Sequence, residues 1–221
     1  MNDQPVIVDL QHFDSQGYFI ARGLLDPEID LRPIKEEYSL LLDSLAEEWH
    51  KDVKVDSTYR DLPFSERLCK FTSQGQDCLR HFDIVLPSNC GADTPIHLGP
   101  AVFNLLRNAH ILDVLENFIG GEIYSNPVQH IRIKTPEKIV PKELLNGLTA
   151  AVGWHQDMGV VNPEADETTM ISVWVAVLDA TVENGCLQVV PGSHRGDLAV
   201  DFHYYEGKRP SFKVNIPGKP L

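Results

Sequence analysis

The chain has 221 residues, of which 43% are hydrophobic and 23% are charged, as in globular proteins with a substantial core. A net charge of −13 argues against nucleic acid or an anionic membrane as partner, and no apolar run reaches the about 18 residues of a membrane helix. The four cysteines are sparse and form no C-x-x-C pair, so we expect neither a disulfide framework nor a zinc cluster, and a cytoplasmic location.

The first part of the chain has helical periodicity. Residues 17–23 lie between glycines and predict a short strand. Asp26 and Pro27 then predict a helix start, because aspartate caps helices and proline is tolerated in the first turn. Pro33 predicts a late start or a kink. Apolar residues at spacings of three and four predict one buried stripe: Leu31, Ile34, Tyr38, Leu41, Leu42 and Leu45.

Residues 50–98 show no clear period and predict irregular structure. A second helix is expected from Gly99-Pro100 to Gly120-Gly121, since glycine commonly ends helices. Its predicted buried face comprises Val102, Phe103, Leu106, Leu112, Leu115 and Phe118. The isolated histidines of this half are expected to be structural or at the surface: His12, His50, His81, His97 and His110.

From residue 122 onward the apolar period shifts toward two, which is typical of strands. In residues 129–134 the isoleucines share one face, and His130, Arg132 and Lys134 share the other. The simpler interpretation is a strand with one solvated face. The alternative is a barrel strand whose polar face lines a cavity, where Arg132 or Lys134 meets an anionic cosubstrate through charge-assisted hydrogen bonds.

Further strands are expected at 169–178, 186–190 and 212–216, with a loop at 135–150. Within the first of these, alternation places Ser172, Trp174 and Ala176 on one face. Helices followed by several short strands predict an α+β chain whose β part is a sandwich or jelly roll.

The segment Trp154-His155-Gln156-Asp157 contains the clearest candidates for metal ligands. In an extended segment His155 and Asp157 point to the same side, so an imidazole nitrogen and a carboxylate oxygen can converge on one point. These are two of the three ligands of the 2-His-1-carboxylate triad that holds non-haem Fe(II). A hydrogen-bonded surface pair is the alternative for so short a motif.

The run from Trp154 to Arg195 contains WHQD and then SVWVAVLDATVENGCLQVVPGSHR. It resembles the phytanoyl-CoA dioxygenase-like family of Fe(II)- and 2-oxoglutarate-dependent oxygenases, and QGYFIARGLLDPE near the N-terminus is similar to that family's opening strand and helix. The resemblance implies a double-stranded β-helix, a cupin-like jelly roll with N-terminal helices. It implies one domain over residues 1–221, mainly helical over 1–120 and a partial jelly roll over 121–221.

The resemblance also implies roles for individual residues. His155 and Asp157 match iron ligands, and Lys134, Gln156 and Trp174 match positions at the 2-oxoglutarate cosubstrate. Halogenating relatives have a small residue in place of the aspartate. The implied reaction is therefore hydroxylation of a small organic substrate by O2, coupled to decarboxylation of 2-oxoglutarate to succinate.

In the family, a third ligand histidine and a 2-oxoglutarate-binding arginine follow the PGSH turn, and the sequence stops at Leu221 before that region. We therefore expect the last jelly-roll strands to be missing. Only His194 and His203 follow Asp157. The alternatives to an oxygenase are a catalytically inactive, truncated jelly-roll fragment and a metal-independent ligand-binding module. The sequence indicates neither the substrate nor the oligomeric state.

Overall fold

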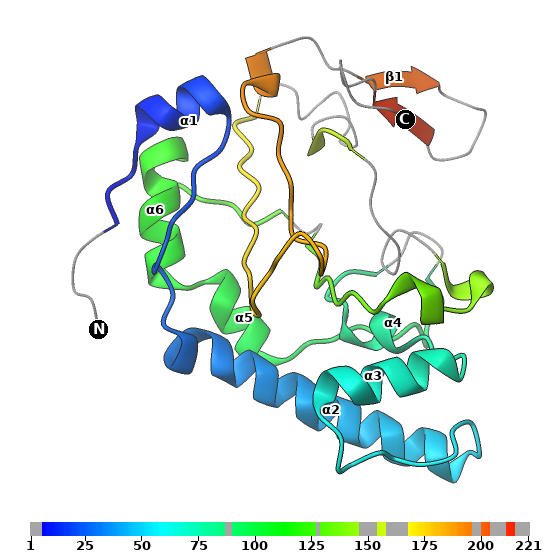
Figure 1. Ribbon diagram of the computed structural model, residues 1–221. Helices are drawn as coiled ribbons and strands as arrows, with labels where there is room; N and C mark the ends of the chain where they lie inside the picture. The colour runs from blue at the N-terminus through cyan, green and yellow to red at the C-terminus, as the bar shows by residue number, and fades with distance from the viewer. Residues whose placement is uncertain are drawn as a thin grey trace.

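The computed structural model describes residues 6–86, 90–126, 129–145, 154–157 and 168–195, and the backbone of 200–203 and 211–214 (Figure 1). The α-helices are α1 (Leu10–Gln16), α2 (Arg32–Lys51), α3 (Phe64–Ser73), α4 (Cys78–Phe82), α5 (Pro100–Leu106) and α6 (Ala109–Ile119). The shorter elements are a π-helical turn η1 (Pro27–Leu31), the 3-10 turns η2 (Glu137–Ile139), η3 (Lys142–Leu144) and η6 (Ser193–Arg195), and strands β1 (Val200–His203) and β2 (Ser211–Val214).

The longest helix, α2, confirms the predicted stripe and its late start. Asp26 accepts hydrogen bonds from the N–H groups of Glu28 and Ile29, which caps η1, and α2 follows directly with Pro33 in its first turn. Proline is tolerated there because the first N–H groups of a helix have no intrahelical acceptor. The buried face extends the prediction by one turn and comprises Ile34, Tyr38, Leu42, Leu45, Ala46 and Trp49.

The helical core forms where α2 meets α3, α4 and α5. The Trp49 and Phe71 rings lie 5.4 Å apart, and the Tyr38 and Phe82 rings 5.2 Å apart, both edge to face. The Tyr38 hydroxyl donates to the Phe82 carbonyl at 3.0 Å, so this phenol is satisfied although it is buried. In Figure 1, α2 runs along one side of the molecule with α3 beside its second half.

Two predictions in this half were wrong. Residues 50–98 contain α3 and α4, and the predicted second helix is split into α5 and α6. The split occurs at Asn108, whose side chain accepts from the N–H groups of His110 and Ile111 and thereby starts a new helix. The break changes the buried face, so that Phe103 is 60% exposed while Leu105 is buried.

The predicted jelly roll is not confirmed, because the described part of residues 121–195 contains no hydrogen-bonded strand. The segments 129–134, 169–176 and 186–190 are extended, but within the described ranges no backbone hydrogen bond joins them into a ladder. A strand requires a neighbour about 4.8 Å away to pair its N–H and C=O groups. Residues 17–23 also fail to form a strand, since Gly17 is left-handed (φ 82°) and caps α1.

Strands β1 and β2 form the sheet seen in the described residues. They pair antiparallel, with Val200 opposite Val214 and His203 opposite Ser211. The predicted strand at 212–216 is confirmed as far as Val214, and residues 215–216 lie outside the described residues. The division of one domain at residue 120 stays a prediction. None of the described helices is both long enough and apolar enough to cross a membrane.

The PGSHR turn at residues 191–195 closes onto the C-terminal end of α1. The Gly192 N–H donates to the Gln16 carbonyl at 2.8 Å, and the Arg195 guanidinium donates to both the carbonyl (2.8 Å) and the carboxylate (2.7 Å) of Asp14. Cations are favourable at a helix C-terminus, where carbonyls lack intrahelical partners. Figure 1 shows this turn beside α1.

Helix α5 starts at Gly99, which has no side chain to cap it. Glu37 of α2 supplies the acceptor instead: its carboxylate accepts from the Ala101 N–H at 2.7 Å and lies 2.7 Å from Nε2 of His97. A Cβ atom on Gly99 would lie 2.0 Å from this carboxylate, which explains the glycine. The Glu37 and His97 side chains are 15% and 10% exposed.

Replacing Glu37 by alanine should therefore lower the free energy of unfolding by about 2 kcal/mol, because the Ala101 N–H and the His97 ring lose their partner. Urea denaturation followed by circular dichroism measures the change. Glu36→Ala is the matched control, since Glu36 pairs with Arg32 on the exposed face and should cost at most about 0.5 kcal/mol. Equal losses in the two variants would contradict the capping role.

Candidate functional site

His155 and Asp157 lie together, as the sequence predicts. Nε2 of His155 is 3.4 Å from Oδ1 of Asp157, and the two side chains are 34% and 52% exposed. Metal–nitrogen and metal–oxygen bonds of about 2.1 Å at right angles would separate two donor atoms by about 3 Å. The two donors are therefore close to the spacing that a single ion requires.

Ser172 supports this pair from a separate segment. Its hydroxyl donates a hydrogen bond to Oδ2 of Asp157, the oxygen that does not face His155. A carboxylate fixed through one oxygen presents the other in a constant direction, which is the usual role of groups around a metal ligand. The sequence could not show this contact, because Ser172 lies 15 residues further along the chain.

The described residues supply two of the three ligands of a facial triad. Among them, no group of three or more His, Cys, Asp and Glu side chains could hold a metal ion. Nε2 of His194 lies 2.9 Å from the Asp14 carbonyl, so this histidine belongs to the contact with α1. For His203 the structure describes only the backbone. One imidazole nitrogen and one carboxylate oxygen suit Fe(II), so the pair fits part of such a site.

Trp174 lies two residues after Ser172. Ser172, Trp174 and Ala176 are exposed, Trp174 at 48%, whereas Val175 and Val177 pack against the helical core. Val173 is also exposed, at 50%, so exposure does not separate two faces at this position. The shared face of Ser172, Trp174 and Ala176 therefore stays a prediction.

Gln156 is half-buried between two exposed neighbours, His155 and Asp157. Its predicted role at the cosubstrate stays a prediction.

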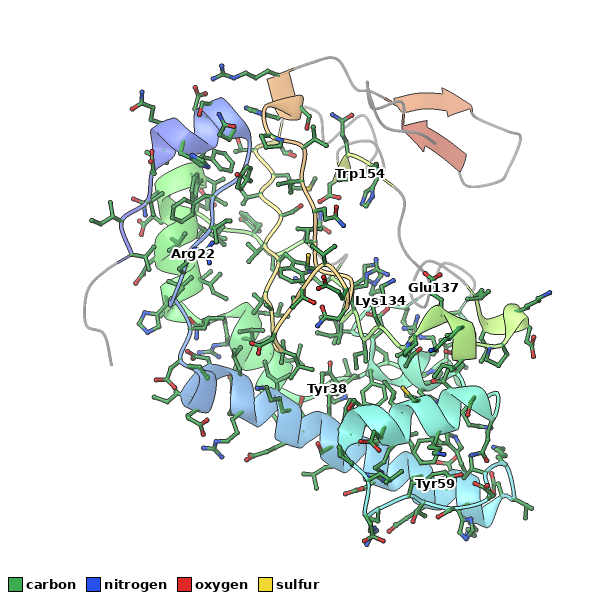
Figure 2. The ribbon with its side chains drawn as sticks, in the orientation of Figure 1. Arg22, Tyr38, Tyr59, Lys134, Glu137 and Trp154 are labelled. Atoms are coloured by element: carbon green, nitrogen blue, oxygen red, sulfur yellow. The ribbon has the colours of Figure 1, made fainter. Side chains whose placement is uncertain are left out.

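Lys134 is half-buried in the extended segment 129–134. Burial lowers the pKa of Lys134, the Arg132 guanidinium lowers it further, and Glu137 opposes both. Figure 2 shows Lys134 and Glu137 close together above α3, with Trp154 farther along the same side of the molecule. A partly desolvated ammonium group beside a guanidinium favours an anionic partner.

Asp83 is the functional candidate that sequence reasoning missed. It is fully buried (0% exposed) and contacts His130 and Ile131, in the segment that carries Lys134. The available signal was a single acidic residue within the apolar run Phe82-Asp83-Ile84-Val85-Leu86, in a region that the sequence predicts to be irregular.

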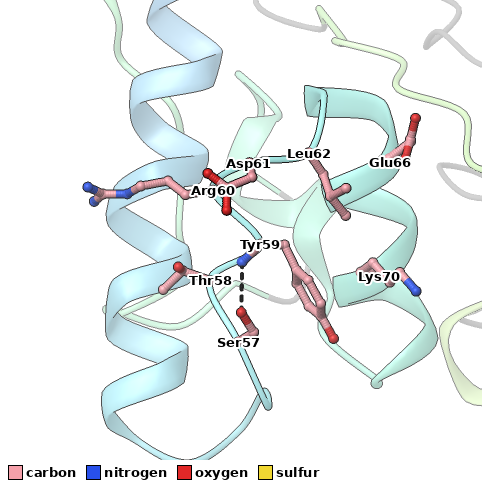
Figure 3. Close-up of a pocket in the computed structure, with 8 residues that line it drawn as sticks. All are labelled: Ser57, Thr58, Tyr59, Arg60, Asp61, Leu62, Glu66 and Lys70. Atoms are coloured by element: carbon pink, nitrogen blue, oxygen red, sulfur yellow. Dashed lines mark hydrogen bonds between the residues drawn. The ribbon is translucent and has the colours of Figure 1, made fainter.

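A pocket of about 560 Å³ lies elsewhere, between the 57–62 loop and α3 (Figure 3). Its lining mixes the cations Arg60 and Lys70 with the acids Asp61 and Glu66. Within the loop, the Tyr59 N–H donates to the Ser57 hydroxyl at 3.2 Å. None of the predicted site residues lines this pocket, so it is separate from the donor pair.

Comparisons with known proteins agree with the resemblance in sequence. The model of the family described as phytanoyl-CoA dioxygenase (PhyH) matches residues 13–214. The phytanoyl-CoA dioxygenase domain-containing protein 1 of Danio rerio is 27% identical over 197 residues, covering 86% of the chain and 66% of that protein. Phytanoyl-CoA dioxygenase 1 of Oryza sativa subsp. japonica is 24% identical over 200 residues, covering 86% and 65%.

A shorter match is the phytanoyl-CoA dioxygenase domain-containing protein 1 homolog of Caenorhabditis briggsae. It is 46% identical over 44 residues, which cover 20% of the chain and 14% of that protein. No solved structure matches the chain. The chain spans slightly less than two thirds of the length of the zebrafish and rice proteins.

Replacing Ser172 by alanine should weaken divalent metal binding about tenfold, because the Asp157 carboxylate loses the hydrogen bond that orients it. Titration with Mn(II), followed by electron paramagnetic resonance of the free ion, measures the dissociation constant. Ser172→Thr keeps the hydroxyl and should bind Mn(II) like the unmodified protein. Unchanged binding by the alanine variant would exclude this role for Ser172.

Proposed function

The chain belongs to the phytanoyl-CoA dioxygenase family, and we propose that it is an Fe(II)- and 2-oxoglutarate-dependent dioxygenase that hydroxylates a small organic substrate. The observation that carries the proposal is the convergence of His155 Nε2 and Asp157 Oδ1, 3.4 Å apart. The family match supports the reaction class, and the relatives that are named dioxygenases support it at 23–24% identity.

In this proposal His155 and Asp157 hold the iron, and Ser172 keeps the carboxylate in place. When bound, Fe(II) together with 2-oxoglutarate and O2 supplies the oxidising chemistry that protein side chains lack. The contribution of the protein is to bring together two ligand atoms from positions two residues apart and to leave the remaining coordination positions accessible.

Lys134 and Trp174 are the proposed cosubstrate residues. The Lys134 ammonium would donate charge-assisted hydrogen bonds to a carboxylate of 2-oxoglutarate, and its partial burial strengthens such a contact. The indole of Trp174 would cover the cosubstrate and limit access of water. A local positive charge is needed here, because the chain as a whole carries a net charge of −13 and repels anions.

The second candidate function is that of a family member that does not catalyse the oxygenase reaction. It is favoured by one observation, that the described residues supply only two ligands of the triad. Such a protein would bind iron weakly, since each lost ligand removes a metal–protein bond. A metal-independent ligand-binding module is the remaining alternative. We also propose that the protein is cytoplasmic and that its substrate is a small molecule.

Purified protein with Fe(II), ascorbate, O2 and 2-oxoglutarate should form succinate, and His155→Ala or excess EDTA should reduce the rate at least about 100-fold. Mass spectrometric detection of succinate measures the rate, and His110→Ala, an isolated histidine on α6, is the matched control that should keep it. Folded protein without turnover at saturating iron would exclude the enzyme. Thermal stabilisation by 2-oxoglutarate that survives EDTA would instead indicate a metal-independent binding module.

A further inference from the structure

The buried carboxylate of Asp83 has contacts that the proposed reaction does not use. Asp83 follows α4, is 0% exposed, and lies in the helical half of the chain. Its side chain contacts residues 130 and 131, which lie 47 and 48 positions away and belong to the extended segment that carries Lys134. Burying a carboxylate is expensive unless it is fully hydrogen-bonded, so such a contact requires an explanation.

Both oxygens of Asp83 are occupied. Oδ1 accepts from the Ile84 N–H at 2.9 Å and from the Ile131 N–H at 3.3 Å, and Oδ2 lies 3.0 Å from Nδ1 of His130. Burial alone would raise the pKa of Asp83, but these hydrogen bonds hold it below its usual value. The group is therefore a carboxylate at neutral pH.

The backbone around Asp83 is anchored to α2 on the opposite side. The Asp83 carbonyl accepts from the His97 N–H at 2.9 Å, and the His97 ring contacts Glu37 of α2 at 2.7 Å. The preceding Phe82 carbonyl accepts from the Tyr38 hydroxyl. Asp83 thus connects a rigid helical core to the 129–134 segment, which lacks ladder hydrogen bonds among the described residues.

The positions after Ile131 depend on this connection. The Ile131 and Ile133 side chains pack against the helical core, and His130, Arg132 and Lys134 take the alternate positions, of which His130 reaches Asp83. With the Ile131 N–H held by Asp83, a shift of the segment by one residue would exchange the two faces. The hydrogen bond from the Ile131 N–H to Asp83 therefore determines on which side of the segment Lys134 lies.

The charges near Asp83 are mostly positive. Nη1 of Arg80 lies 3.8 Å from Oδ2. Burial lowers the pKa of Arg132, and the nearby Asp83 carboxylate opposes this shift. Glu137 is the acidic group that acts on Lys134, whereas Asp83 acts on its neighbour Arg132. Removal of the Asp83 charge would leave the Arg132 guanidinium beside Lys134 less compensated and, by Coulomb's law alone, this region more attractive to an anion.

We propose that Asp83 is a positioning residue for the anionic cosubstrate: by fixing His130 and the Ile131 amide to the helical core, it holds Lys134 in the orientation that binds 2-oxoglutarate. This inference rests on the proposed function, in which Lys134 meets a carboxylate of 2-oxoglutarate. It assigns part of the cosubstrate affinity to a residue that does not touch the cosubstrate.

A positioning role and a purely electrostatic role of Asp83 predict opposite effects of Asp83→Asn on the dissociation constant for 2-oxoglutarate. An asparagine oxygen can still accept from the Ile84 and Ile131 amides, but its NH2 group cannot accept a hydrogen bond from Nδ1–H of His130. If Asp83 positions Lys134, the dissociation constant for 2-oxoglutarate should rise about tenfold. If Asp83 acts only as a negative charge, the constant should fall.

Calorimetric titration with 2-oxoglutarate at saturating Mn(II), a stand-in that does not turn over, measures this constant. The dissociation constant for Mn(II) is recorded in parallel and should stay within about twofold, because His155 and Asp157 are not altered. A purely structural role would weaken both. Asp43→Asn is the matched control, since it breaks a comparable ion pair to Arg67 (2.7 Å) between α2 and α3 and should leave 2-oxoglutarate binding unchanged.

His130→Ala tests the same contact should Asp83→Asn not fold. The His130 side chain is 31% exposed, so in this variant water can take the place of the imidazole beside Asp83 and the protein should fold. The variant should also weaken 2-oxoglutarate binding without affecting Mn(II). Equal or tighter 2-oxoglutarate binding in the variants that fold overturns the inference and leaves the proposed function intact. Unmodified protein that binds Mn(II) but not 2-oxoglutarate overturns both.

Discussion

The structure depends on a carboxylate that has no contact with solvent. Asp83 is stable as an anion only because the His130 ring and two backbone amides replace the water it has lost. The same bonds connect the helical core to the extended segment 129–134, which carries Lys134 and which no ladder hydrogen bonds hold among the described residues. A polar contact with a defined direction specifies one arrangement, whereas apolar packing alone tolerates several.

The spacing of apolar residues predicts those elements of the chain whose structure depends on residues a few positions apart. The spacing of Ile34, Tyr38 and Leu42 predicts the buried face of α2. Alternation predicts the exposure of Ser172 and Trp174 but not that of Val173, which is 50% exposed. The break between α5 and α6 was missed because Asn108 suits either a helix interior or a cap. Its cap role is reinforced by a hydrogen bond to Asp30, 78 residues away, which no local window contains.

The same distinction applies to the candidate site. His155 and Asp157 converge as predicted, although Asp157 lies in a 3-10 turn and not in the extended strand that the prediction assumed. Ser172 and Asp83 lie in other segments, and their roles follow only from tertiary contacts. The predicted strands are not confirmed because strand pairing also depends on tertiary contacts. Residues 169–178 have the composition of a strand, but composition does not determine which segment pairs with them, and among the described residues they form no hydrogen-bonded ladder.

The burial of the tryptophans gives the two halves of the molecule separate optical signals. Trp49 is 4% exposed among aromatic rings of the helical core, while Trp154, next to His155, is half-buried and Trp174, two residues after Ser172, is 48% exposed. An indole in an apolar environment emits at shorter wavelength than one in water. The blue edge of the emission spectrum therefore reports on packing between α2 and α3, and the red edge reports on the surroundings of Ser172 and Asp157. Loosening of the helical core and changes at the site can thus be followed independently in the unmodified protein.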